Sequence, residues 1–184
     1  MIINSRSSNF IFNFPVGFFL EQIETKYKSY INRMPGLPWD TLTNMMNAHV
    51  QSITMPSMSM SPVSQTRRLG KQQTYKSGQP VPDYFTKEMT VTMKALDGYI
   101  NYWIFLENTL LHLDLKDEPS LYFDDMFVRI IDQEGHIIQT IRFEKPMLTN
   151  LSEISLSYSD NNPDFSTFDC TFTYNAMELL VEHD

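Results

Sequence analysis

Apolar and polar residues alternate along much of this chain, and such alternation predicts β-strands because successive side chains of a strand point to opposite faces. The clearest example is residues 168–174, where every second residue is Phe, Cys or Tyr. Residues 160–164 are typical of a turn, and they follow another alternating segment at residues 154–158. We expect further strands at residues 8–14, 46–60, 85–95, 121–131 and 136–144, with the last two joined as a hairpin.

Two segments have helical spacing instead. Residues 17–33 carry apolar side chains three and four positions apart, and residues 98–112 do the same behind Asp97, a candidate N-cap. Two prolines and a glycine at residues 34–38 end the first helix. Residues 62–82 show neither apolar period, so we expect a long loop or an extended hairpin tip there, and loops of this length are usually functional or disordered.

These patterns predict a mainly β fold: an antiparallel β-sandwich or rolled sheet with one flanking α-helix. A small helical and proline-rich insertion at residues 15–44 follows the first strand. The length of 184 residues and a hydrophobic content of 42% suit a single domain over residues 1–184 and exclude a mostly disordered chain. The longest near-continuous apolar run, residues 14–20, is too short to span a membrane, so we expect cytoplasmic synthesis and no membrane partner.

The net charge of −8 is unevenly distributed. Residues 1–113 hold 10 basic and 7 acidic side chains, whereas residues 114–184 hold 4 basic and 15 acidic ones. An acidic balance argues against a nucleic-acid-binding domain. One basic part and one acidic part suit head-to-tail self-association, because opposite patches attract each other. Uneven surface charge on a monomer explains the same numbers, and the sequence leaves both interpretations open.

The sequence offers no catalytic, metal or cofactor site. None of the four histidines belongs to an HExxH or HxH pattern, and no GxSxG, Walker or GxGxxG motif is present. Cys170 lies between Phe168 and Phe172 on the apolar face of a predicted strand, so we expect a small core residue rather than a nucleophile. Asp124 and Asp125 are adjacent, and neighbouring strand residues point to opposite faces. We therefore predict no enzyme and no cofactor.

The predicted strands have one unusual feature: their polar faces are rich in hydroxyl groups. These faces consist of Ser57, Ser59 and Ser61, of Thr90 and Thr92, of Ser155, Ser157 and Ser159, and of Thr171 and Thr173. Exposed strand faces usually recruit Lys, Glu and Arg as well. A solvated antiparallel sheet is one explanation. The other is a wall along which a polyanion can slide, because it offers almost no cationic partner for phosphate.

The order of these elements resembles that of the tail tube proteins of contractile-tailed bacteriophages. Residues 146–158 are similar to the family's turn and alternating strand, and residues 159–162 to its acidic hairpin tip. Residues 165–174 resemble the last strand of the family. Upstream, the strand at residues 88–93 with the helix at 99–111, and the strand at 9–14, are also similar. The insertion at residues 15–44 departs from the family pattern.

The resemblance implies hexameric rings that stack head to tail, in which two hairpins from each subunit line a channel for transient, non-specific DNA passage. The candidate channel-facing residues are Ser57, Ser59, Thr90, Thr92, Ser155, Ser157, Thr171 and Thr173. The segment at 62–82 would help to stack rings, with Arg67, Arg68, Lys71 and Lys76 facing the acidic half of a subunit in the next ring.

The implied partners are further copies of the chain, the tail sheath, the baseplate and the tape-measure protein, and the implied location is the virion after synthesis in the host cytoplasm. Two alternatives stay open. One is a specialised baseplate-proximal or neck-proximal ring, in which residues 15–44 contact a protein outside the tube. The other is the inner-tube subunit of a contractile secretion or injection machine.

Overall fold

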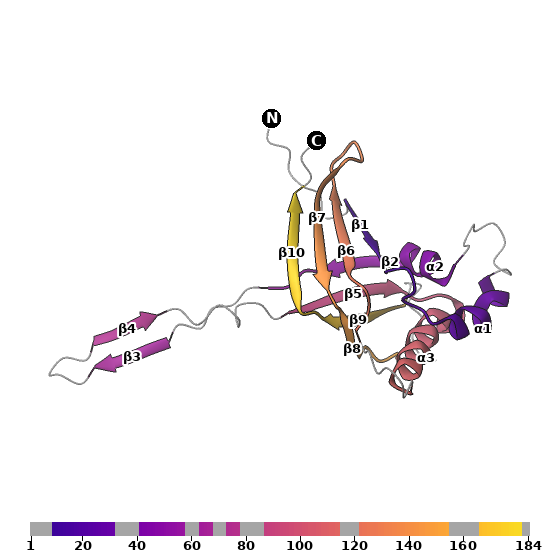
Figure 1. The fold of residues 1–184 in the computed structure, drawn as a ribbon, viewed down its shortest axis with the longest axis horizontal. Helices are drawn as coiled ribbons and strands as arrows, with labels where there is room; N and C mark the ends of the chain where they lie inside the picture. The colour runs from indigo at the N-terminus through magenta and orange to yellow at the C-terminus, as the bar shows by residue number, and fades with distance from the viewer. Residues whose placement is uncertain are drawn as a thin grey trace.

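The computed structural model describes residues 9–31, 41–57, 63–67, 73–77, 87–114, 122–154 and 166–181 (Figure 1). The helices are α1 (Glu21–Ile31), α2 (Leu42–Ala48) and α3 (Ile100–Asp114), and a 3₁₀ turn at Asp97–Tyr99 precedes α3. The strands are β1 (Phe10–Asn13), β2 (Val50–Thr54), β3 (Val63–Arg67), β4 (Gln73–Ser77), β5 (Glu88–Lys94), β6 (Met126–Ile131), β7 (Ile137–Glu144), β8 (Met147–Leu151), β9 (Thr167–Thr173) and β10 (Ala176–Val181).

Two antiparallel four-stranded sheets form the body of the protein. Their strand orders are β1-β6-β7-β10 and β2-β5-β9-β8, and the strands of one sheet cross those of the other (Figure 1). Strands β3 and β4 form a separate antiparallel pair, which Figure 1 shows apart from the two large sheets. The predicted fold class is confirmed: the chain is mainly β, with two antiparallel sheets and few helices.

The core lies between the facing apolar sides of the two sheets. Every second residue of β5 and β9 is buried, as are Phe12 on β1, Val128 on β6 and Phe143 on β7. Aromatic rings join the layers: Phe14, which follows β1, lies 5.5 Å from Phe105 on α3, measured between ring centroids. Each buried aromatic side chain removes a large apolar area from water, so these rings contribute substantially to hydrophobic stability.

Two buried asparagines connect α3 to the segments around it. Asn108 donates to the carbonyl of Phe18 and accepts from the backbone N–H of Leu20, both at 3.0 Å. Asn101 donates to the carbonyl of Lys94 at 2.8 Å and accepts from the backbone N–H of Leu96 at 3.1 Å. Buried amides are tolerated where their hydrogen-bonding capacity is used, so these bonds fix where α3 lies.

The expected helix at 17–33 appears as α1 and the expected helix at 98–112 as α3, but Asp97 is not its N-cap. Asp97 begins the 3₁₀ turn, whose N-cap Leu96 makes no side-chain cap bond. Gly98 and Tyr99 have φ of 70° and 56°, so the backbone is kinked before α3 begins at Ile100.

The predicted strand at 46–60 is wrong at its beginning, where the structure has the helix α2. Thr41 caps this helix by accepting from the backbone N–H of Asn44 at 3.2 Å. Leu42, Met45 and Met46 are buried, and their spacing is that of a helix rather than a strand. Strand β2 begins only at Val50 and ends at Thr54. Helix α2 therefore begins at the end of the expected insertion and continues beyond residue 44, and the alternation of serines and methionines further along concealed it.

The strand that pairs with β9 in the described part, on the side away from β5, is β8, at Met147–Leu151, which was not predicted as a separate strand. The strand predicted at residues 154–158 lies outside the described residues, except for residue 154, which is in no strand. Strand β10 was not predicted, since the sequence Ala-Met-Glu-Leu-Leu-Val shows no alternation. Among the described residues, no helix is long and apolar enough to cross a membrane.

Candidate functional site: a hydroxyl-rich sheet face

The polar face predicted from the sequence lies on the central strands β5 and β9. Met89, Val91 and Met93 of β5 are fully buried in the core, so Thr90 and Thr92 between them lie on the opposite face of the sheet. Thr90 pairs with Thr171 of β9, and their Oγ1 atoms are 3.3 Å apart, within hydrogen-bonding distance. One hydroxyl group can therefore donate a hydrogen bond to the other across the strand boundary.

The hydroxyl-rich face continues onto β8. The Thr173 hydroxyl donates to the Thr149 hydroxyl at 3.3 Å, and the Thr149 hydroxyl donates to the carbonyl of Thr171 at 3.1 Å. A register shift between Leu148 and Asn150 lets Thr149 reach β9 in this way. A row of hydroxyl groups consequently runs from β5 across β9 to the edge strand β8.

On the other side, the face continues onto β2. Ser52 lies opposite Thr92, and Thr54 lies opposite Thr90, and residues directly opposite in a sheet share a face. Sequence reasoning missed Ser52, Thr54 and Thr149 as members of this face. Serine and threonine flanking Ile53 were a readable signal, but it was masked by assigning the whole of 46–60 to one strand.

Few charges accompany these hydroxyl groups. On β5 and β9, the charged residues of this face are Glu88, Lys94 and Asp169, which is one cation against two carboxylates. Glu88 and Lys94 are the end residues of β5, and Asp169 lies opposite Thr92. The described face of β5 and β9 is therefore mostly hydroxylated, with a single carboxylate, Asp169, between the charged ends of β5.

The structure brings four of the eight predicted channel-facing residues together: Thr90, Thr92, Thr171 and Thr173. Ser57 is exposed but follows the end of β2, so it is not part of a strand. Ser59, Ser155 and Ser157 lie outside the described residues. That this face lines a channel stays a prediction.

The basic residues assigned to ring stacking are on or beside the β3–β4 hairpin. Arg67 is the last residue of β3 and Lys76 lies in β4, where it pairs with Ser64, while Arg68 and Lys71 lie outside the described residues. Of the two expectations for 62–82, the structure has the hairpin. Its role in stacking stays a prediction.

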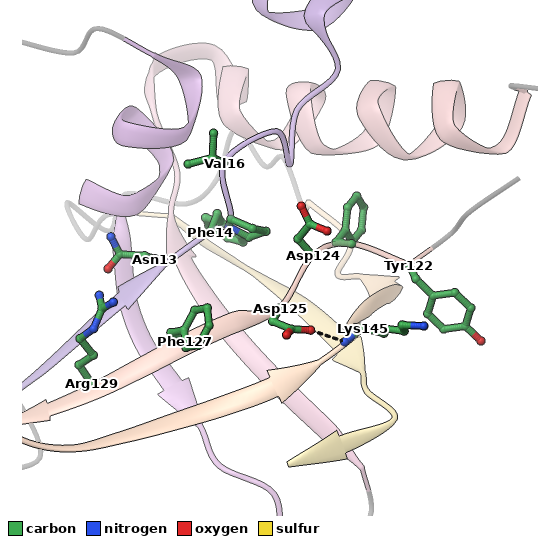
Figure 2. Close-up of a pocket in the computed structure, with 11 residues that line it drawn as sticks. Asn13, Phe14, Val16, Tyr122, Asp124, Asp125, Phe127, Arg129 and Lys145 are labelled. Atoms are coloured by element: carbon green, nitrogen blue, oxygen red, sulfur yellow. Dashed lines mark hydrogen bonds between the residues drawn. The ribbon is translucent and has the colours of Figure 1, made fainter. Parts of the chain in front are cut away.

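The groups considered for catalysis have ordinary structural surroundings. Burial raises the pKa of the Cys170 thiol, which has no exposed surface and sits in the core. In the hollow beside β1 and β6, Figure 2 shows Asp124 and Asp125 directed differently. Burial would raise the pKa of Asp125, but hydrogen bonds from Arg142 and the backbone N–H of Lys145 outweigh it and lower that pKa. Asp125 is thus an ion-pair partner rather than a proton donor.

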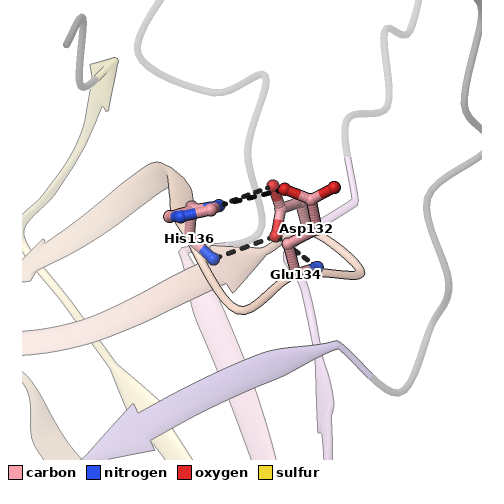
Figure 3. Close-up of side chains that lie close together, drawn as sticks. All are labelled: Asp132, Glu134 and His136. Atoms are coloured by element: carbon pink, nitrogen blue, oxygen red, sulfur yellow. Dashed lines mark hydrogen bonds and ion pairs between the residues drawn. The ribbon is translucent and has the colours of Figure 1, made fainter.

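Asp132, Glu134 and His136 gather at the tip of the β6–β7 hairpin, with potential metal-binding atoms within 4.8 Å of one another (Figure 3). The Asp132 carboxylate accepts from the backbone N–H of Glu134 at 2.7 Å and of His136 at 2.9 Å. These bonds, the one from His136 foremost, lower the pKa of Asp132. The cluster is explained by the closing of an exposed turn.

No protein-family model matches the sequence, and neither does any curated protein. Several solved structures, however, are similar to this chain. A chain in the anti-feeding prophage cap, its tube-terminating cap, aligns with a TM-score of 0.56 at 8% identity, covering 99% of this chain and 94% of that one. This chain has a tail-tube-like fold.

Two more structures show the tail-tube-like fold. A chain in the sheath/tube terminator of the extracellular contractile injection system PVC aligns with a TM-score of 0.55 at 11% identity, covering 98% and 99% of the two chains. A chain in the six-fold symmetrised baseplate of the anti-feeding prophage aligns with a TM-score of 0.50 at 9% identity, covering 98% of both. At such identities the likeness concerns the fold.

Proposed function

We propose that this chain is a structural subunit of a contractile-tail tube, in which copies form stacked hexameric rings around a channel. The observation that carries the proposal is the hydroxyl-rich face of β2, β5, β9 and β8, whose central strands place a fully apolar core on the other side. Such a sheet needs water on one face and a closed surface at its edges, and a barrel built from several copies provides both.

The strand directions favour ring closure by identical copies. In the order β2-β5-β9-β8 each neighbouring pair is antiparallel, so β8 runs opposite in direction to β2. A second copy placed in the same orientation therefore brings its β2 antiparallel beside β8 of the first. The contact is heterologous, and repeating it by rotation closes a ring without leaving a free edge.

The chemistry of the face suits the passage of a polyanion. Phosphate groups bind tightly where Lys and Arg neutralise them, and on β5 and β9 this face offers only Lys94 at one end of β5. Threonine hydroxyl groups that already bond to one another, such as Thr90 with Thr171, keep the wall wet without holding the cargo. Double-stranded DNA is the cargo we propose, as in a phage tail within the virion.

Helix α3 is the surface that we assign to partners outside the tube, such as a sheath. Phe105 and Tyr102 pack on Phe168 of β9 from the core side, so the helix lies opposite the hydroxyl-rich face. Its outer side exposes Trp103 and, further along, Leu110 and Leu113. Exposed apolar side chains in such a row favour contact with another protein.

A second candidate is a terminal ring at the baseplate or neck, or a tube subunit that delivers protein cargo in an injection machine. Negative-stain microscopy of the purified protein distinguishes a tube-body subunit from a terminal ring. A tube-body subunit is expected to give long tubes, and a terminal ring only isolated rings. A protein that stays monomeric at high concentration, whatever the salt, would contradict every assembly function proposed here.

A further inference from the structure

Strand β10 exposes residues on the side that is buried in the rest of its sheet. Met177 and Leu179 pair with Phe143 and Ile141 of β7, which are buried, and residues paired in this way share a face. Yet Met177 is 39% exposed, Leu179 56% and Val181 55%. The core-facing side of the sheet therefore continues beyond the core, where no described residue covers it.

Strand β10 is also an edge. Within the described part of the chain it pairs with β7 alone, and Figure 1 shows it at the border of its sheet. Edge strands usually avoid unwanted pairing through charges, proline or bulges. Here the only charged residue is Glu178, and Arg142 of β7 already binds it, with an N···O distance of 3.3 Å. An open edge with an apolar face and no protecting charge indicates a strand that binds another strand.

The opposite edge of the same sheet has the matching pattern. Strand β1 carries no charged residue, its Phe12 faces the core and its Ile11, on the other face, is 42% exposed. Ile11 belongs to a row that crosses the sheet through Arg129 and Thr140 to Leu180, which is 38% exposed. The rows on both faces of β10 would thus meet apolar residues of β1 if the sheet continued.

Strand directions allow that continuation. Each neighbouring pair in the order β1-β6-β7-β10 is antiparallel, so β10 runs opposite to β1. We propose that β10 binds the β1 edge of a second copy of this chain, which extends the sheet head to tail. Ile11 of one copy then lies beside Leu180 of the other, and Phe12 continues the apolar face of Leu179.

This contact grows in a different direction from the ring closure proposed above, because the strands of the two sheets cross (Figure 1). We therefore assign it to the contact between successive rings, an assignment that rests on the proposed function. The pairing of β10 with β1 depends only on the edges themselves, and the experiment separates the two.

The test is covalent capture of neighbouring copies with a bis-maleimide reagent. The double variant Ile11→Cys/Leu180→Cys is compared with each single variant, and native Cys170 provides a silent background because it has no exposed surface. We expect a ladder of cross-linked dimers, trimers and longer species from the double variant and no ladder from either single variant. Lys28→Cys/Leu180→Cys is the matched control, since Lys28 is exposed on α1, and it should give no ladder.

Three results would overturn the pairing. Dimers from Leu180→Cys alone would show two β10 strands meeting each other. The absence of a ladder from the double variant would show that β10 is covered otherwise, for instance by residues 1–8 of its own chain. A ladder of equal intensity from the Lys28 control would show non-specific capture. Micrographs of the same samples test the proposed function separately. Rings without a cross-linked ladder would contradict only the pairing of β10 with β1. A ladder without rings would contradict only the proposed ring.

Discussion

Thr90 on β5 and Thr171 on β9 face each other on the outer side of two strands whose inner side is buried, with their hydroxyl oxygens 3.3 Å apart. One of these hydroxyl groups can donate to the other, and the surface around them is polar with few charges. This combination is what the proposed channel requires, because a passing polyanion meets hydroxyl groups and hardly any cations.

A positively charged side chain on this face should make the face bind DNA. We expect the Thr171→Lys variant to fold normally, since residue 171 points away from the core, and to bind short duplex DNA that the wild-type assembly does not retain. Several lysines in one ring would make the binding strongly salt-dependent. Fluorescence anisotropy across a series of salt concentrations measures it.

Gln22→Lys is the control for that variant, because it adds the same charge on the exposed surface of α1. DNA binding by the Gln22→Lys protein equal to that of Thr171→Lys would show that the position of the charge does not matter. Such a result would argue against a channel at the hydroxyl-rich face.

The β3–β4 hairpin should contribute to stacking through its basic residues. Reversing Arg67, Arg68 and Lys71 to Glu is expected to shorten tubes or release single rings, because these side chains would then repel the acidic half of the neighbouring subunit. Tube lengths in micrographs measure the effect, and circular dichroism checks that the fold is kept.

Replacing the same three residues by Gln separates loss of attraction from added repulsion. We expect intermediate tube lengths for the Gln protein and a smaller difference between the two variants at high salt, where exposed charges are screened. An unchanged yield and length of tubes from the Glu protein would contradict the assigned role of the hairpin.

Asn108 should be worth far more stability than an exposed polar residue on the same helix. Asn108→Ala removes both hydrogen bonds to the segment after β1 and leaves the Phe18 carbonyl and the Leu20 N–H buried without these partners. We expect a loss of about 2–4 kcal/mol in the free energy of unfolding, measured by urea denaturation.

Thr109→Ala, one residue along, is the comparison for Asn108→Ala. The Thr109 hydroxyl donates only to the Phe105 carbonyl within its own helix, at 2.9 Å, so its loss should cost less than about 1 kcal/mol. Equal losses from the two variants would show that Asn108 does not anchor the insertion to α3.

His112 should make the protein less stable in mild acid. Burial lowers the pKa of His112 below its usual 6.5, against a hydrogen bond with the backbone of Phe18, and its Nε2 is buried with no hydrogen-bond partner among the described residues. The unfolded chain therefore binds a proton more readily than the folded one. Stability from this group is complete above pH 6.5 and is lost as the pH falls through the lowered pKa.

Urea denaturation between pH 7.5 and about pH 5 measures this loss, and the His112→Gln protein should lose less stability over the same range. His136→Gln is the control, because the His136 side chain is 72% exposed on the turn between β6 and β7. A wild-type pH dependence that survives in the His112→Gln protein would assign the acid sensitivity to other groups.

The central strands of the hydroxyl-rich sheet were predictable because one face is apolar and the other polar, so apolar and polar residues alternate along the sequence. In β5 and β9 the buried residues and the threonines alternate without interruption, so both strands and their shared polar face could be named. The helix α3 was predictable for the same reason, with a different period.

The edge strands were harder to predict, because their side chains do not alternate cleanly between a buried face and a solvent-exposed face. Strand β8 contains a register shift at Thr149, so its apolar and polar residues do not alternate regularly. Strand β10 is exposed on both faces, so burial imposes no alternation on it. Helix α2 was hidden by a run of alternating residues that begins only after β2. The side chains that complete the candidate site, Ser52, Thr54 and Thr149, lie on these outer strands.

The most direct test of the proposed function is a cryo-electron microscopy reconstruction of the assembled protein. The account predicts six-fold rings in which Thr90, Thr92, Thr171 and Thr173 point into a central channel, with β8 of each subunit beside β2 of the next. A reconstruction in which these threonines face the outer surface, or in which the copies enclose no channel, would contradict it.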